Sequence, residues 1–164
     1  MLVVAEKEIG GLMTPEAAFE AVEAVFAAMD AGKAWNFPVV REAIGHEDAL
    51  YGFKGGFDAS ALTLGLKAGG YWPNNADRGL INHQSTVFLF DPDTGRVAAA
   101  VGGNLLTALR TAANSVMFAR QLARKDSKVM ALIGAGSQSE FQALGFRSVL
   151  GIEDLRVYDV DPAA

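Results

Sequence analysis

The residues with the clearest chemical potential form a glycine turn late in the sequence, in the stretch KVMALIGAGSQSEF. Gly134, Gly136 and Ser139 occupy the three marked positions of a G-x-G-x-x-G pattern. The flanking residues predict a strand from Lys128 to Ile133 and a helix from Ser137 to Leu150. Such a turn directs backbone N–H groups and a helix N-terminus at a pyrophosphate. Serine at the third position departs from the pattern, but that position requires only a small side chain.

An acidic residue follows this turn at a distance that suits nucleotide binding. Asp159 ends the next predicted strand, in DLRVYD, about twenty residues after the turn. A carboxylate at this place accepts hydrogen bonds from both ribose hydroxyls and repels a 2'-phosphate, so the pattern favours NAD over NADP. The alternative is a tight strand-to-helix turn with a surface acid, which many α/β proteins contain without a nucleotide.

Four cationic residues lie in apolar or glycine-rich surroundings, where long charged side chains are usually paired or functional: Arg41, Lys54, Lys67 and Arg110. The pattern places Arg110 in the first turn of a helix capped by Thr107. A cation is disfavoured there unless it shares an anion with the free N–H groups, which predicts a carboxylate or phosphate clamp. For each cation the alternative is a surface side chain or a salt bridge.

The histidines and the composition narrow the classes of chemistry. His83 and His46 are candidates for acid–base chemistry, although a lone histidine at a strand edge is more often structural. The 164 residues include no cysteine, which excludes disulfides, thiol nucleophiles and Cys-ligated zinc. A net charge of -5 argues against nucleic-acid and membrane-surface partners. The N-terminus lacks a signal-peptide pattern and no apolar run could cross a bilayer, which predicts a cytoplasmic protein.

The remaining sequence predicts the elements that position these residues. A helix begins at Thr14 and ends before Gly32, and residues 37–102 predict four or five strands in a mixed or antiparallel sheet. Asp91 to Gly95, DPDTG, is typical of a hairpin turn. We therefore expect an α/β fold with two domains. Residues 1–126 form a sheet-and-helix domain for substrate binding and dimerisation, and residues 127–164 form the first β-α-β of a Rossmann domain. Because its last strands lack neighbours, we expect the sequence to be a fragment of a longer protein.

Three stretches together resemble the ornithine cyclodeaminase and mu-crystallin family: LGLKAGGYWPNN, LTALRTAA and, one helix later, IGAGSQSEFQ. The resemblance covers nearly the whole chain and implies a homodimer that binds NAD(H). It also implies that Lys67, as catalytic residue, holds the carboxylate of a small amino or imino acid near the nicotinamide together with Arg110 and Arg41. Asn82 and His83 match the segment that lines the nicotinamide pocket. The positions that match the cofactor site are Thr111, Gly134, Gly136, Ser137, Gln138 and Asp159.

The resemblance implies hydride transfer at a Cα–N bond, as in an ornithine cyclodeaminase, an alanine dehydrogenase or a cyclic imine reductase. Deaminating members carry a carboxylate where this sequence has Lys54, which argues against ornithine as substrate. The family's catalytic aspartate would lie beyond Ala164. Two alternatives stay open, a nucleotide-dependent binding protein of the mu-crystallin type and a fragment that is inactive by itself.

Overall fold

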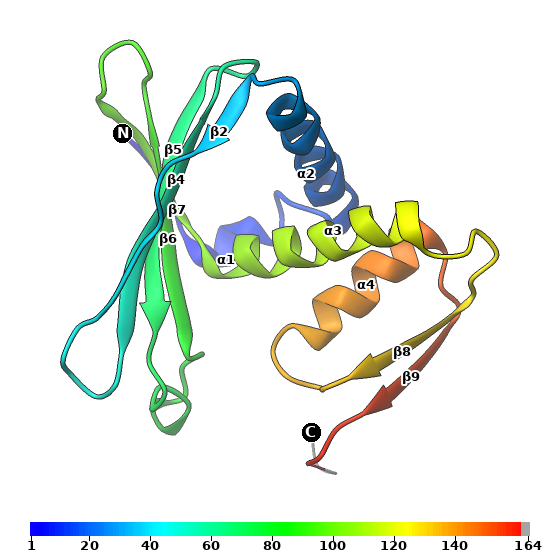
Figure 1. Cartoon of the computed structure of the whole chain (residues 1–164). Coiled ribbons are helices and arrows are strands. Elements are labelled where there is room, and N and C mark those ends of the chain that lie inside the picture. Colours follow the sequence, from blue (N-terminus) through cyan, green and yellow to red (C-terminus); the bar gives the residue numbers. More distant parts are fainter. Residues whose placement is uncertain (162–164) are drawn as a thin grey trace. The chain divides into compact units, whose positions relative to one another are not determined.

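A computed structural model describes residues 1–161 and shows two compact units. The sheet unit consists of Met1–Gly10 and Val25–Leu105, and the βαβ unit consists of Gly11–Ala24 and the chain from Leu106 onward. Figure 1 shows the elements of both units along the chain. The mixed α/β class predicted from the sequence is confirmed, whereas the predicted domain boundary at residue 126 stays a prediction.

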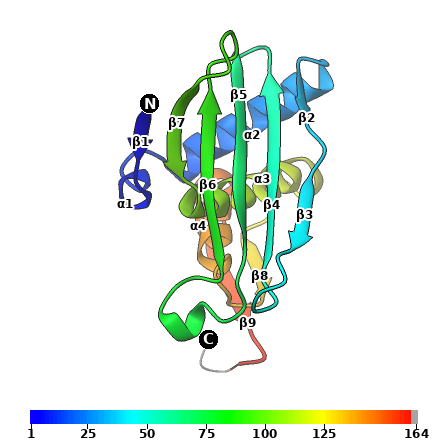
Figure 2. The same ribbon diagram turned by 90° about the vertical axis from the view of Figure 1, so that its left-hand side faces the viewer.

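The sheet unit is built on one mixed sheet of seven strands (Figure 2). The strands lie in the order β1-β7-β6-β5-β4-β2, β3 also pairs with β4, and β1 with β7 is the parallel pair. The four or five strands predicted within residues 37–102 are confirmed, because β3 to β7 lie there. The sheet also contains β1 and β2, which were not predicted because such short strands leave no alternating pattern. The strands are β1 (Leu2–Val4), β2 (Ala34–Asn36), β3 (Val40–Ala43), β4 (Leu50–Asp58), β5 (Thr63–Tyr71), β6 (His83–Phe90) and β7 (Val97–Gly102).

The hairpin between β6 and β7 has the turn that the sequence predicts. The Asp91 carboxylate accepts hydrogen bonds from the N–H groups of Asp93, at 2.9 Å, and Thr94, at 3.2 Å. These bonds stabilise the charged form and lower the pKa of Asp91. Gly95 has a φ of 70°, a conformation that glycine adopts without steric cost.

The first long helix, α2 (Pro15–Asp30), also forms as predicted. The Thr14 hydroxyl oxygen accepts a hydrogen bond from the Ala17 N–H at 3.2 Å, which caps the N-terminus. Gly32, with a φ of 69°, terminates the helix in a left-handed conformation. A shorter helix, α1 (Glu6–Ile9), precedes it.

The start of α3 (Asn104–Leu122) corrects the sequence analysis. The helix begins before Thr107 because the Glu6 carboxylate accepts hydrogen bonds from the N–H groups of Asn104, at 3.1 Å, and Leu105, at 2.7 Å. Because Glu6 is distant in sequence, no local sequence pattern predicts that it caps this helix. Arg110 therefore lies in the second turn, so its predicted place in the first turn of the helix is wrong. Its role in binding a carboxylate stays a prediction.

The βαβ unit contains β8 (Val129–Ile133), α4 (Ser139–Leu150) and β9 (Asp154–Tyr158). The two strands are parallel along their whole length, from the pair Val129 and Asp154 to the pair Ile133 and Tyr158. The predicted strand–helix–strand order is confirmed, with the helix beginning two residues later than expected. Gly145 lets α4 approach α3, because a Cβ there would lie 3.2 Å from the Val116 side chain.

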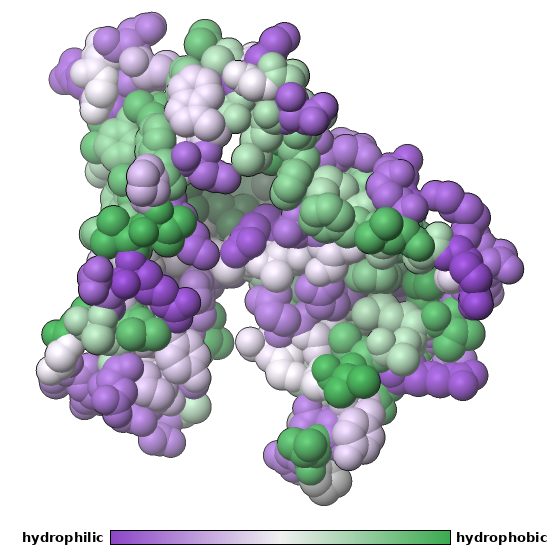
Figure 3. Space-filling model, viewed as in Figure 1, coloured by the Kyte–Doolittle hydropathy of each residue, from purple (hydrophilic) through white to green (hydrophobic). Residues whose placement is uncertain are grey.

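The strands of the βαβ unit expose apolar side chains. Ile133 is 85% exposed, Tyr158 65% and Val157 51%. Figure 3 shows hydrophobic residues on the surface at the β8–β9 end of this unit. Parallel strands are normally covered on both faces, which makes this surface unusual. None of the helices within residues 1–161 has the length and apolar character to cross a bilayer.

Candidate functional site

Three predicted cations lie on one face of the large sheet. Lys54 on β4 stands directly opposite Lys67 on β5, and directly paired residues project from the same face. Arg41 on β3 stands opposite Gly52, which is two residues from Lys54 and therefore on the same side. We call the surface formed by Arg41, Lys54 and Lys67 the cation face.

Glycines surround the two lysines on this face. Each position two residues away along β4 or β5 is a glycine, and their backbones lie close to neighbouring strands. A Cβ on Gly56 would lie 2.6 Å from the Trp35 carbonyl oxygen, and a Cβ on Gly69 would lie 2.6 Å from the Ser85 side chain. Sheet packing therefore requires glycine at these positions, because any larger residue would clash with the neighbouring strands. The four glycines are Gly52, Gly56, Gly65 and Gly69.

The end of α2 lies over the same side of the sheet. Val25 and Met29 line a hollow together with Gly56, Asp58 and Gly65, which all project from the cation face. Arg41 and Lys54 are exposed, whereas Lys67 is partly buried. Within residues 1–161, neither Arg41 nor Lys54 makes an ion pair with an acid.

His83 and Asn82 lie at one end of the cation face. His83 begins β6 opposite Tyr71, on the same side of the sheet as Lys67. The Asn82 side chain donates a hydrogen bond to the Tyr71 hydroxyl at 3.2 Å and accepts one from the Ala76 N–H at 3.0 Å. Asn82 therefore holds the segment between β5 and β6 in place, which is a structural task that the sequence did not reveal.

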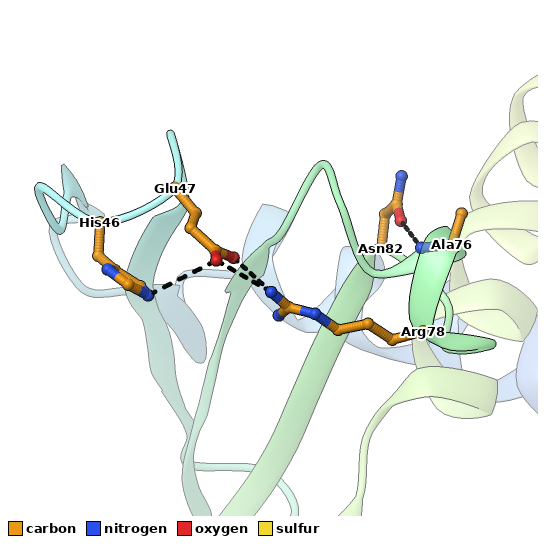
Figure 4. Close-up of polar contacts among 5 residues, drawn as sticks. All are labelled: His46, Glu47, Ala76, Arg78 and Asn82. Atoms are coloured by element: carbon orange, nitrogen blue, oxygen red, sulfur yellow. Dashed lines mark hydrogen bonds and ion pairs between the residues drawn. The ribbon is translucent and has the colours of Figure 1, made fainter.

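An ion pair fastens that same segment to the loop between β3 and β4 (Figure 4). Arg78, in the short 3-10 helix η1 (Ala76–Arg78), donates to both carboxylate oxygens of Glu47 at 2.8 and 2.9 Å. His46 lies 4.0 Å from the same carboxylate, and its side chain is 75% exposed. The structure thus places His46 in a solvated loop, apart from the cation face.

The glycine turn of the βαβ unit has open space beside its backbone and is held by a backbone hydrogen bond. A Cβ built on Gly134 or Gly136 would meet no atom within 4 Å. Gly134 has a φ of 101° and donates its N–H to the Tyr158 carbonyl at 2.8 Å, which extends the β8–β9 pairing. This turn therefore leaves free space beside its backbone, as the approach of a phosphate requires.

Asp159 lies against this turn. Its carboxylate accepts hydrogen bonds from the N–H of Ala135 at 2.6 Å and from the N–H of Asp161 at 2.8 Å. These bonds lower the pKa of Asp159 below its ordinary value of 3.8, so the carboxylate is charged at neutral pH. The Asp159 carboxylate therefore contributes to folding stability above pH 3.8, and this contribution is lost as the pH falls further and the carboxylate becomes protonated.

The turn also contains a buried acceptor that lacks a donor. Gln138 immediately precedes α4, and its side-chain Oε1 is buried and accepts no hydrogen bond from the described residues. Ser137 is exposed at the same turn. An unpaired buried oxygen is costly, and a ligand hydroxyl would satisfy it. The open glycines, Gln138 and Asp159 together fit a dinucleotide.

Arg110 and Thr111 lie on α3 in the βαβ unit. The same helix contains Asn114, a candidate ligand-binding residue that the sequence analysis missed. The Arg110 side chain is exposed, although partial desolvation of the guanidinium lowers its pKa. The Thr111 hydroxyl donates to the Thr107 carbonyl at 2.6 Å. Asn114, one turn after Arg110, has a buried Oδ1 without a partner among residues 1–161. The sequence signal that could have identified Asn114 is its polar amide side chain within an alanine-rich helical segment.

The predicted residues therefore fall into two groups. The sheet unit brings Arg41, Lys67 and His83 to one face, and the βαβ unit brings the glycine turn and Asp159 together. Because Arg110 belongs to the βαβ unit, a carboxylate site shared with Lys67 stays a prediction. Within the described residues, no group of His, Asp and Glu is arranged to hold a metal ion.

The sequence profile of the ornithine cyclodeaminase/mu-crystallin family matches residues 1–164. Iminosuccinate reductase of Paracoccus denitrificans (strain Pd 1222) is 80% identical over 142 residues, which is 87% of this chain and 44% of that protein. Its crystal structure in complex with NAD+ superposes with a TM-score of 0.92 at 72% identity, covering 99% of this chain and 50% of the other. The chain spans about half the length of the relatives it matches.

Two more distant structures have the same fold. Δ(1)-pyrroline-2-carboxylate reductase of Thermococcus litoralis, in complex with NADH and L-proline, gives a TM-score of 0.94 at 30% identity. An archaeal alanine dehydrogenase dimer with bound NAD gives a TM-score of 0.92 at 31% identity. Each alignment covers 99% of this chain and 50% of the other chain.

The two turn glycines are expected to differ in their effect on stability. Gly134→Ala should lower the free energy of unfolding by about 1–3 kcal/mol, because alanine is strained at a φ of 101°. Gly136→Ala should be neutral or stabilising by about 0.4–1 kcal/mol, because the position has open space and no left-handed φ. Urea denaturation of both variants measures the difference, and equal losses would contradict the assignment of strain to Gly134.

Proposed function

We propose that this chain, which belongs to the ornithine cyclodeaminase/mu-crystallin family, carries the nucleotide-binding and substrate-holding residues of an NAD(H)-dependent imino acid reductase. The observation that carries this proposal is the open glycine turn with the Asp159 carboxylate hydrogen-bonded to it. We propose iminosuccinate as the substrate, because the iminosuccinate reductase of Paracoccus denitrificans is 80% identical over 142 residues.

The cofactor site consists of residues from the turn and from α3. The backbone N–H groups from Gly136 to the start of α4 face the pyrophosphate, because those of Gly134 and Ala135 already donate to Tyr158 and Asp159. Asp159 accepts the ribose hydroxyls. Ser137, Gln138 and Thr111 complete the proposed contacts. When bound, NADH supplies a hydride to the imine carbon while the imine nitrogen takes up a proton, which yields the amine and NAD+.

The cations hold and orient the organic acid. Lys67, proposed as the catalytic residue, binds the α-carboxylate together with Arg110, and Arg41 adds a further positive charge. Two charge-assisted hydrogen bonds fix a carboxylate in position and orientation, which brings the reacting carbon into a near-attack geometry. Asn82 holds in place the β5–β6 segment that leads into His83.

The predicted division of the chain into two domains agrees with these roles. We propose that residues 1–126 form the substrate-binding and dimerisation domain and that residues 127–164 begin the nucleotide-binding domain. Reduction by NADH requires a compartment that maintains the reduced nucleotide, so we also propose that the protein works in the cytoplasm.

A homodimer would cover the second face of the sheet. Tyr51 and Phe53 lie there with their ring centroids 5.6 Å apart, and Phe53 is 45% exposed. A self-complementary apolar face suits a two-fold dimer, and the archaeal alanine dehydrogenase of the same fold is a dimer. We call this surface the aromatic face: Tyr51, Phe53, Phe57, Leu64, Leu66, Phe88 and Phe90.

The reductase proposal predicts an activity that depends on Arg110. The full-length protein should oxidise NADH with the imine that forms from oxaloacetate and ammonia. Arg110→Ala should reduce kcat/KM by about 10- to 100-fold through loss of a charged hydrogen bond. The dissociation constant for NADH should stay within about 2-fold, because Arg110 contacts the substrate.

Arg147→Ala, which removes an exposed arginine from α4, is the matched control and should retain full activity. A wild-type protein that binds NADH but reduces no imino acid would contradict the reductase proposal and would favour a binding protein of the mu-crystallin type. Failure of the wild type to bind NADH would contradict the cofactor proposal as well.

The dimer proposal predicts that one charge on the aromatic face separates the subunits. Phe53→Glu should give a monomer, because the interface would have to bury an unpaired carboxylate. Leu62→Glu, at an exposed position in the turn between β4 and β5, should stay dimeric. Size-exclusion chromatography with light scattering gives the masses, and a monomeric wild type would refute the proposal.

A further inference from the structure

The direct opposition of Lys54 and Lys67 creates a concentration of positive charge. Their Cβ atoms, as a directly opposed cross-strand pair, lie about 5 Å apart, and like charges in this arrangement destabilise a sheet. Lys54 has no acid partner in the part of the chain that the structure describes. A bound anion would offset the repulsion between two directly opposed lysines, which would account for their placement.

One acid lies on the same side of β4, but it makes no ion pair with Lys54. Asp58 projects from the cation face, but its carboxylate accepts hydrogen bonds from the N–H groups of Ser60, at 2.8 Å, and Ala61, at 3.3 Å. Asp58 thus stabilises the turn between β4 and β5. Arg41 and Lys54 lie on this face without an ion pair to an acid of the described residues, so both positive charges are available to a bound anion.

The arrangement of the two lysines separates their roles. Lys67 is partly buried on the inner strand β5, whereas Lys54 is exposed on β4, one strand away. An imino acid whose α-carboxylate is held by Lys67 would direct a short acidic side chain toward the neighbouring strand, where Lys54 is the opposing group. Gly56 and Gly65, the neighbours of the two lysines on this face, line the hollow beside the end of α2, which provides space for that second carboxylate.

We infer that Lys54 is a specificity-determining residue that binds the side-chain carboxylate of a dicarboxylic imino acid. This inference rests on the proposed reductase function and names the substrate feature that this site selects. Lys54 takes no part in hydride transfer. It lowers KM for substrates with two carboxylates, and its neighbour Lys67 serves substrates with one or two.

The test compares two imines in the full-length protein. One forms from oxaloacetate and ammonia and has two carboxylates, and the other forms from pyruvate and ammonia and has one. The wild type should prefer the dicarboxylic imine. Lys54→Met should raise KM for that imine by about 10- to 100-fold, the effect of one lost charged hydrogen bond. Its kcat, and the kinetics with the pyruvate imine, should change by less than about 2-fold.

Two variants serve as controls for charge and for folding. Lys54→Arg keeps a cation and should restore most of the preference for the dicarboxylic imine. Lys33→Met removes an exposed lysine of the sheet unit and should change neither KM. Lys54→Met should unfold at the same urea concentration as the wild type or a higher one, because it relieves the repulsion with Lys67.

A binding experiment gives a readout that needs no turnover. Succinate has two carboxylates and propionate has one, so calorimetric titration of the NAD+-saturated protein should show tighter binding of succinate. Lys54→Met should remove this difference. A wild type that reduces the pyruvate imine equally well, or a Lys54→Met variant with unchanged preference, would overturn the role of Lys54 and leave the reductase function intact. Reduction of neither imine would overturn both.

Discussion

A hydrogen bond between a backbone N–H and a carboxylate fixes the nucleotide-binding geometry that we propose. The Asp159 carboxylate accepts this bond from Ala135, in the middle of the glycine turn, at 2.6 Å. The contact is possible because β8 and β9 are parallel, so that their carboxyl ends lie at the same edge. The Gly134 N–H extends the same pairing through the Tyr158 carbonyl. Turn and acid therefore form one preorganised unit.

Alternation along antiparallel strands organises the other half of the chemistry. Residues two apart on β4 and β5 share a face, so the cations gather on one side and the aromatic residues on the other. One sheet thereby separates a proposed anion-binding surface from a proposed dimer surface. The sheet unit offers cations to an organic acid, while Asp159 offers a carboxylate that attracts ribose hydroxyls and repels additional phosphate.

The sequence predicted those features that depend on local patterns. Thr14 and Gly32 delimit α2 because caps act within a few residues, and the turn beginning at Asp91 forms its predicted hairpin. The start of α3 could not be predicted, because Glu6 caps it from almost a hundred residues away. The pairing of Lys54 with Lys67 also escaped the sequence analysis, since strand register depends on contacts between strands.

Calorimetric titration of NADH and NADPH into the full-length protein and its Asp159→Ser variant tests the central claim most directly. The account predicts that the wild type binds NADH at least about 10-fold more tightly than NADPH, because the carboxylate favours the ribose hydroxyls over a 2'-phosphate. The variant should lose most of that preference. A wild type that binds neither nucleotide, or a variant with unchanged preference, would contradict the account.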